Sequence, residues 1–248
     1  MYSLLSRLTG SAAAATTTTT AASAAAGDAP TTTPAAAAAS ATPSLAPVQG
    51  AIRARRAVYP KDMLRGAVLP RDKLERALEA ARWAPTHKLT QPWRFVVLHG
   101  ASSKAEFEDL TIALVEKHTA DPDKREATLK KMRRKKDNDW KNVGAYVAIV
   151  LRRTQGATAP PEWEEAASVA MATQNLWLAA WEEGIHGYWS SWQPPARDAD
   201  EMKAFLGLDQ QTDRVMGFFV CGVADPQRLG GYRGSRRPLG EVVEWRME

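Results

Sequence analysis

A sharp change in composition near residue 50 limits what this chain can fold into. Residues 1–50 are mostly Ala, Thr, Ser and Pro, and only Arg7 and Asp28 among them are charged. All nine tryptophans follow residue 50. About 200 residues therefore supply the core, enough for one domain that buries roughly 70% of its unfolded surface. This excludes a disulfide-stapled miniprotein and a largely disordered chain.

The first 50 residues have two interpretations. They are nearly free of acids and rich in hydroxyl side chains, as organellar transit peptides are, although they are poor in arginine. Alternatively, they form a low-complexity tail that cannot bury enough apolar surface to fold. We expect a leader over 1–50 and a single domain over 51–248. A transit peptide would direct the protein to a plastid or mitochondrion, and without one it would be cytoplasmic.

Several classes of site are excluded by what the sequence lacks. The single cysteine, Cys221, cannot form an intramolecular disulfide, and it lies in an apolar pattern typical of a buried strand. The four histidines show no ligand spacing, so we expect no metal site. No GxGxxG, Walker or GxSxG motif occurs, and no stretch approaches the ~20 apolar residues of a transmembrane segment.

The net charge of +5 is concentrated in one segment. Residues 124–141 (KREATLKKMRRKKDNDWK) carry nine Lys or Arg against three acids. Such a run could attract nucleic acid or anionic lipid, but it lacks the interleaved aromatics that stack on bases. We therefore interpret it as a solvated helix face and expect no specific nucleic-acid partner. The alternative is a basic RNA- or membrane-associated binding protein.

Hydrophobic patterns predict a mixture of helices and strands. Apparent capping boxes, Asp72 with Glu75, Ser103 with Glu106 and Asp198 with Glu201, predict three helix starts. The longest helix is expected over 161–184, where Gly184 ends an Ala-rich pattern of about 20 residues. Apolar runs predict strands over 94–98, 146–151, 187–192 and 213–225, and EVVEW (241–245) as an edge or exchanged strand. Without strict βαβ alternation, the fold class is α+β with a central sheet.

Three segments combine polar or cationic groups with aromatics at element boundaries. The first is RARR (53–56), whose guanidinium groups match a phosphate. The second is APTHKLTQPW (84–93), where two prolines constrain the loop that carries His87 and Gln91. The third is GYWSSW (187–192), whose hydroxyls and amides could bond a planar ring. Each is also compatible with an ordinary basic turn, structural loop or core strand.

In order along the chain, these segments resemble the FMN-dependent nitroreductase family. RRAVYPKDM resembles the family's opening segment, and EAARWAPTHKLTQPWRFVVL its EAAxxAPSxxNxQPWxF segment. SVAMATQNLWLAAWEEGIHGYWSS resembles its AxxxAxQNxxLAAxxxGxGxxW helix, and RRPLGEVVEW its closing RxPLEEVV. The match spans about residues 50–246 and is most similar to the subgroup of small proteins named putative NAD(P)H nitroreductases.

The resemblance implies a fold, a cofactor and an activity. The fold would be a central mixed or antiparallel sheet flanked by helices in an intertwined homodimer, with an FMN site at each interface. The activity would be ping-pong transfer of reducing equivalents from NAD(P)H to a nitroaromatic, quinone or similar small acceptor. Reductive dehalogenation or flavin-consuming chemistry on the same fold is the alternative. No single side chain is named as catalytic.

The family pattern also implies which residues bind the cofactor. Arg55 and Arg56 would hold the phosphate and ribityl chain, with the amide of Ala57 nearby, and Arg236 would be the terminal phosphate-binding arginine. The remaining expected contacts are Trp83, His87, Trp189, Ser190 and Ser191. Ala57 departs from the usual serine, and Tyr59 stands where some branches have a lysine near the flavin. That lysine's task could fall to Lys88, Arg53 or backbone amides.

Overall fold

The computed structural model describes residues 45–230 and 234–247. Most of the expected leader, residues 1–44, lies outside the described residues. The first described helix, α1 (Leu45–Ala54), runs across the expected boundary at residue 50. From Ser44 onward the chain forms one compact unit.

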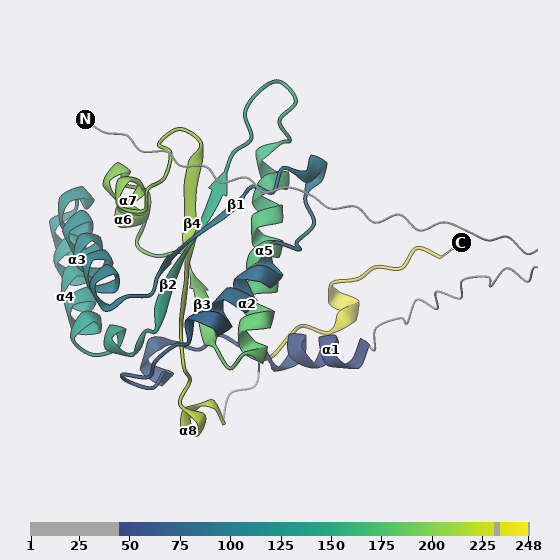
Figure 1. Ribbon diagram of the computed structural model, residues 1–248, viewed down its shortest axis with the longest axis horizontal. Helices are drawn as coiled ribbons and strands as arrows, with labels where there is room; N and C mark the ends of the chain where they lie inside the picture. Colours follow the sequence, from purple (N-terminus) through teal and green to yellow (C-terminus); the bar gives the residue numbers. More distant parts are fainter. Residues whose placement is uncertain (1–44, 231–233, 248) are drawn as a thin grey trace, which may run out of the picture. The chain divides into compact units, whose positions relative to one another are not determined.

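A four-stranded antiparallel sheet is the centre of this unit (Figure 1). Its strands are β1 (Trp93–Leu98), β2 (Ala145–Arg152), β3 (His186–Ser190) and β4 (Asp213–Gly222). Their order is β1-β2-β4-β3, and each neighbouring pair is antiparallel. The four predicted strands and the α+β class are therefore confirmed. This order places β2 and β4 in the interior of the sheet.

Helices cover both faces of the sheet (Figure 1). On one face, α3 (Ala101–His118) and α4 (Pro122–Asp137) pack with the short helices α6 (Pro194–Arg197) and α7 (Asp200–Phe205). On the other face, α2 (Arg71–Ala81) packs against α5 (Glu162–Glu182). Shorter turns connect these elements: η1 (Pro60–Asp62), η2 (His87–Leu89), η3 (Trp140–Asn142), α8 (Pro226–Leu229) and η4 (Leu239–Glu241).

Strand β2 is buried on both faces, and its successive side chains belong to two different core layers. Tyr146, Ala148 and Val150 point toward α3 and α4. Val147 and Ile149 point toward α2 and α5. Successive side chains of a strand face opposite sides, so this continuous apolar run needs a helical layer on each side. Three-to-four spacing along α5 predicts one core side, whose residues are buried at Val169, Thr173, Leu176 and Ala180 and half-buried at Ala170 and Trp177.

The three predicted capping boxes are wrong, although the helices they introduce exist. Pro70, Gly100 and Ala199 occupy the N-cap positions of α2, α3 and α7, and none of them caps with its side chain. The acids expected to cap have other partners. Asp72 accepts a hydrogen bond from Arg76, and Glu201 accepts one from Lys117. The boxes fail because α2 begins before Asp72, α3 begins before Ser103, and α7 begins one residue later than expected.

The basic segment and the C-terminal segment differ in how far they match the prediction. The basic segment is the helix α4, of which only Leu129 and Met132 are buried, and most of its cations face solvent.

The C-terminal segment 242–247 is not a strand in this chain. Its pairing with a second chain stays a prediction. Large apolar side chains of η4 and of this segment are exposed: Leu239, Val242, Val243, Trp245 and Met247.

A buried carboxylate links three of the four strands. Asp213 of β4 has no exposed side-chain surface, and it accepts two hydrogen bonds of 2.8 Å from Arg152 of β2. It also accepts one of 3.2 Å from Arg94 of β1. The bonds from Arg152 hold the pKa of the Asp213 carboxyl below its ordinary value, although burial opposes this shift.

We predict that Asp213→Ala lowers the free energy of unfolding by about 2–3 kcal/mol, because two partly buried arginines lose their shared acceptor. Asp198→Ala is the matched control, because Asp198 pairs with Arg197 at an exposed site and should cost less than about 1 kcal/mol. Urea denaturation measures both values. Equal losses would contradict the structural role of Asp213.

The stability of wild type and that of Asp213→Ala should also depend differently on pH. The pKa of Asp213 is lower in the folded state than in the unfolded state, where it is about 3.9. Asp213 therefore stabilises the fold fully above the unfolded pKa, and this stabilisation is lost as the pH falls through the folded pKa. The stability difference between wild type and Asp213→Ala should therefore be complete at pH 6 and shrink progressively below about pH 4.

Candidate functional site

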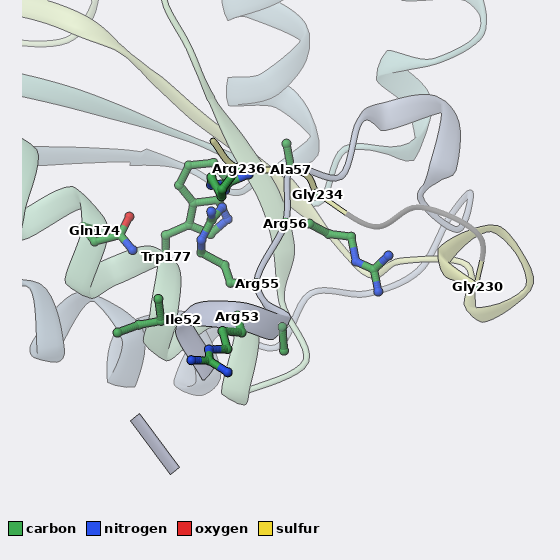
Figure 2. Close-up of a pocket in the computed structure, with 11 residues that line it drawn as sticks. Ile52, Arg53, Arg55, Arg56, Ala57, Gln174, Trp177, Gly230, Gly234 and Arg236 are labelled. Atoms are coloured by element: carbon green, nitrogen blue, oxygen red, sulfur yellow. The ribbon is translucent and has the colours of Figure 1, made fainter. Parts of the chain in front are cut away.

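A cavity with a volume of about 800 Å³ has four arginines in its lining (Figure 2). It lies where the end of α1, the C-terminal half of α5 and the segment around Arg236 meet. Four of the nine residues expected to bind a cofactor line it: Arg55, Arg56, Ala57 and Arg236. The other lining residues are Ile52, Arg53, Ala54, Gln174, Trp177, Gly230 and Gly234.

Arg55 is the best-defined cation of this cavity. Its guanidinium carbon lies 4.1 Å from the centroid of the Trp177 ring, in cation–π geometry. The Nε atom of Arg55 is buried without a hydrogen-bond partner. Burial, and then the nearby charge of Arg236, lower the pKa of Arg55. Figure 2 shows Arg55 and Arg236 gathered beside Trp177. Two repelling guanidinium groups and an unused donor form a site that an anion would complete.

The local chain direction explains how Arg55 and Arg56 come to diverge. The Arg55 amide donates to the Ala51 carbonyl and extends the last turn of α1, and the chain then becomes extended. Val58 donates to the Gly187 carbonyl, which ties the segment to the start of β3. Arg56 lies 6.0 Å from the Trp181 ring, so it points to a different part of α5 from Arg55.

Two lining residues of α5 were not predicted as site residues. Trp177 matches the helical core spacing, and the sequence therefore predicts it as a core residue. It is half-buried in the core, but its ring also supports Arg55. Gln174 precedes it by one helical turn and shares its face. A polar residue one turn before a tryptophan on a mostly apolar helix is the signal that could have identified this pair.

The second group of expected residues follows α2, and of these His87 lies at the N-terminal end of α5. Trp83 is 77% exposed just after α2, and His87 begins η2. The Nδ1 atom of His87 lies 2.6 Å from Oε2 of Glu164, in the first turn of α5. Lys88, one of the cations considered for the missing lysine, donates to the carbonyl of Thr158. Arg53, the other, lines the cavity.

The backbone around η2 is strained. Lys88, Leu89 and Gln91 have φ values of 52°, 54° and 45°. Residues other than glycine rarely adopt these left-handed conformations. The loop is held by a contact of 3.1 Å between the hydroxyls of Thr86 and Thr90. Strain of this kind persists where the surroundings impose it, and it is common at functional sites.

The third group, Trp189, Ser190 and Ser191, lies at and just beyond the end of β3. Trp189 donates from Nε1 to the carbonyl of Met216, and Trp189 and Ser190 pass very close to Gly217. A Cβ atom at Gly217 would lie 2.3 Å from the Ser190 carbonyl oxygen, so only glycine fits there. Trp192 turns the chain with a φ of 61°, and its amide donates to Ser190 Oγ.

One chain does not bring all nine expected residues together. Glu164, the partner of His87, and Trp177, the partner of Arg55, are 13 positions apart on α5, which at 1.5 Å per residue is roughly 20 Å. Trp189 is nearer the cavity. It pairs in register with Phe219, whose ring centroid is 5.8 Å from that of Trp177.

Other kinds of site lack support in the described part of the chain. Residues 45–230 and 234–247 contain no group of three His, Cys, Asp or Glu that could hold a metal ion. Burial raises the pKa of the Cys221 thiol to about 12, so it is not a thiolate nucleophile at neutral pH. Among the helices that the structure describes, none is long and apolar enough to cross a membrane.

Comparison with known proteins identifies the family. A sequence model of the nitroreductase family matches residues 52–223, and the chain belongs to this family. YfhC of Bacillus subtilis, named a "Putative NAD(P)H nitroreductase", is 30% identical over 148 residues, which are 60% of this chain and 71% of YfhC. YdjA of Escherichia coli K12, which has the same descriptive name, is 25% identical over 154 residues, or 61% of this chain and 75% of YdjA.

Solved structures share the fold. A nitroreductase-like family protein from Bacillus cereus superposes with a TM-score of 0.64 at 20% identity, covering 81% of this chain and 96% of its own. The FMN-dependent nitroreductase NfnB from Mycobacterium smegmatis, in complex with NADPH, has a TM-score of 0.61 at 18% identity, covering 82% and 100%. The expected nitroreductase-like fold is thus confirmed.

The strain in the η2 loop can be measured at Leu89, whose side chain is 78% exposed. We predict that Leu89→Gly is more stable than Leu89→Ala by about 0.5–1 kcal/mol, because glycine adopts a positive φ without steric cost. The alanine variant removes the same side chain and keeps the strain. Urea denaturation gives both free energies of unfolding. If the alanine variant is the more stable, the left-handed conformation does not exist in solution.

Proposed function

We propose that this protein is an FMN-dependent oxidoreductase that transfers reducing equivalents from NAD(P)H to a nitroaromatic, quinone or similar acceptor. The observation that carries the proposal is the cavity in which Arg55 and Arg236 crowd together, with the Arg55 Nε buried and unpaired. A phosphate dianion would satisfy this donor and remove the repulsion between the two cations. Membership of the nitroreductase family makes the phosphate of FMN the group that best fits.

The residues present are chemically suited to FMN. Arg55 and Arg236 would hold its phosphate, with Arg56 and the amide of Ala57 at the same cavity. Ala57 offers no hydroxyl, so the arginines carry more of the binding. The amides and hydroxyls of Ser190 and Ser191, together with the ring of Trp189, would face the flavin at the end of β3. These roles follow the family pattern.

A homodimer would unite the separated groups. His87 lies roughly 20 Å along α5 from the cavity in its own chain, so a partner chain would have to supply it. The exposed apolar side chains of the C-terminal segment, Trp245 among them, offer a surface for such a partner. Each cofactor would then be bound mainly by one chain and completed by the other.

The protein's own task in this chemistry is mainly positioning. Bound FMN would supply the redox chemistry, accepting a hydride from NAD(P)H and then passing it to the acceptor. A single cleft used in turn by reductant and oxidant predicts ping-pong kinetics. Arg53, which lines the cavity beside Arg55, would add positive charge there in the absence of the lysine that Tyr59 replaces.

The visible spectrum of the purified protein, after incubation with FMN and desalting, tests this function. We expect the absorbance bands of bound oxidised flavin, which should bleach when NAD(P)H is added without oxygen and return when menadione is added. A protein that binds no flavin under these conditions would refute the proposal. Salt-sensitive binding of RNA by such a protein would favour the basic binding-protein alternative.

The phosphate role of Arg55 gives a separate prediction. Arg55→Ala should weaken FMN binding about tenfold or more, because a charge-assisted hydrogen bond contributes roughly 1.5–3 kcal/mol. Arg71→Ala is the matched control, because Arg71 pairs with Glu75 and is 82% exposed away from this cavity. Flavin fluorescence during titration with FMN measures both affinities. Equal affinity in the two variants would exclude Arg55 as a phosphate ligand.

A further inference from the structure

The first turn of α5 carries three acids, and each has a different partner. Glu162 pairs with Arg214, and Glu165 is buried against Arg153 and Thr154. Glu164 pairs with His87, with 2.6 Å between Oε2 and Nδ1. The histidine and the glutamate are 77 positions apart in the sequence. The contact therefore depends on η2 docking against α5.

The loop that carries His87 is held in the shape that this contact needs. The amide of Gln91 donates to Thr86 Oγ1 at 3.2 Å, and Lys88 Nζ donates to the Thr158 carbonyl at 3.1 Å. Between these bonds the chain passes through the left-handed conformations at Lys88, Leu89 and Gln91. An unfavourable backbone maintained by several local bonds indicates that the position of the side chain matters.

The pairing with Glu164 decides which nitrogen of His87 can exchange a proton. A carboxylate accepts hydrogen bonds and does not donate them when ionised, so Nδ1 carries the proton in this contact. Nε2, on the opposite side of the ring, is then the nitrogen that gains or loses a proton. The His87 side chain is 52% exposed, and no hydrogen bond to Nε2 occurs within residues 45–230 and 234–247.

The surroundings of the imidazole suit a flat aromatic ligand. Leu89, on the same 3-10 turn, is 78% exposed, and Trp163, next to Glu164, is 70% exposed. Both are large apolar side chains left in contact with solvent beside a polar group. Both are accessible to an aromatic ligand that reaches this loop.

We propose that His87, held by Glu164, is the proton donor to the electron acceptor in the oxidative half-reaction. This rests on the proposed function. Reduction of a quinone requires a hydride, supplied by the reduced flavin, and one proton, which would come from Nε2 of His87 to the quinone oxygen. Reduction of a nitro group to a nitroso group likewise takes one hydride and one proton, and the oxygen that leaves departs as water. His87 regains its proton from solvent, and Glu164 is a positioning residue.

Stopped-flow reoxidation of the flavin-loaded protein tests the proposal. The protein is reduced with NAD(P)H without oxygen and mixed with menadione or with ferricyanide, which takes single electrons and needs no proton. We expect His87→Ala to slow reoxidation by menadione about 100-fold, the scale of general acid catalysis, and Glu164→Ala to slow it about tenfold. Reoxidation by ferricyanide should be unchanged in both variants.

Glu162→Ala is the matched control, because it removes the same charge from the same helical turn without touching His87. It should behave as wild type with both acceptors. A second readout does not depend on the flavin. The ¹⁵N NMR signals of the His87 ring should show the proton of the neutral imidazole on Nδ1 in wild type and in Glu162→Ala, and mostly on Nε2 in Glu164→Ala.

The outcomes separate this proposal from the proposed function. If no variant and no wild type binds a reducible flavin, the proposed function fails and this proposal fails with it. If flavin binds and is reduced, but His87→Ala reacts with menadione as fast as wild type, only the proton-donor role is overturned. Equal slowing with menadione and with ferricyanide would also overturn it, because ferricyanide needs no proton.

Discussion

The two-sided burial of β2 and β4 is the constraint on which the rest of this structure depends. Every side chain from Ala145 to Leu151 is fully buried, so the sheet needs a helical layer on each face. The odd-numbered residues of β2 require α2 and α5, and the even-numbered ones require α3 and α4. Asp213 adds an ionic link across β1, β2 and β4. The position of α5, and with it the candidate site, follows from this packing.

Helix α5 serves both as a core element and as the support of the functional groups. Its C-terminal half presents Trp177 to Arg55, and its first turn presents Glu164 to His87. The 13 positions between these contacts separate the arginine-lined cavity from a polar, strained loop by roughly 20 Å. A rigid helix keeps that separation constant within one chain. The proposed dimer would bring each region next to the complementary region of the partner chain.

Sequence patterns located most elements but described their ends poorly. The apolar runs at 146–151 and 213–225 predicted β2 and β4 because two-sided burial leaves a strong signal in a short segment. The capping boxes failed because α2 and α3 begin before the expected cap residues, Asp72 and Ser103, and α7 begins after Asp198. The motif indicates that a helix begins nearby, but it does not fix the first residue. The C-terminal EVVEW segment, predicted as an edge or exchanged strand, forms no strand with the described residues of this chain.

The sequence by itself determined the family, the α+β class and the arginines offered to an anion, because these depend on residue types in a fixed order along the chain. Tertiary structure alone decided which groups meet. It joined Arg55 to Trp177, which the periodicity of α5 predicts as a core residue, and it joined His87 to Glu164 across 77 positions. Contacts between distant segments depend on how the two helical layers pack on the sheet. Local sequence patterns do not predict that packing. Because the candidate site is formed by contacts between distant segments, only the tertiary structure could define it.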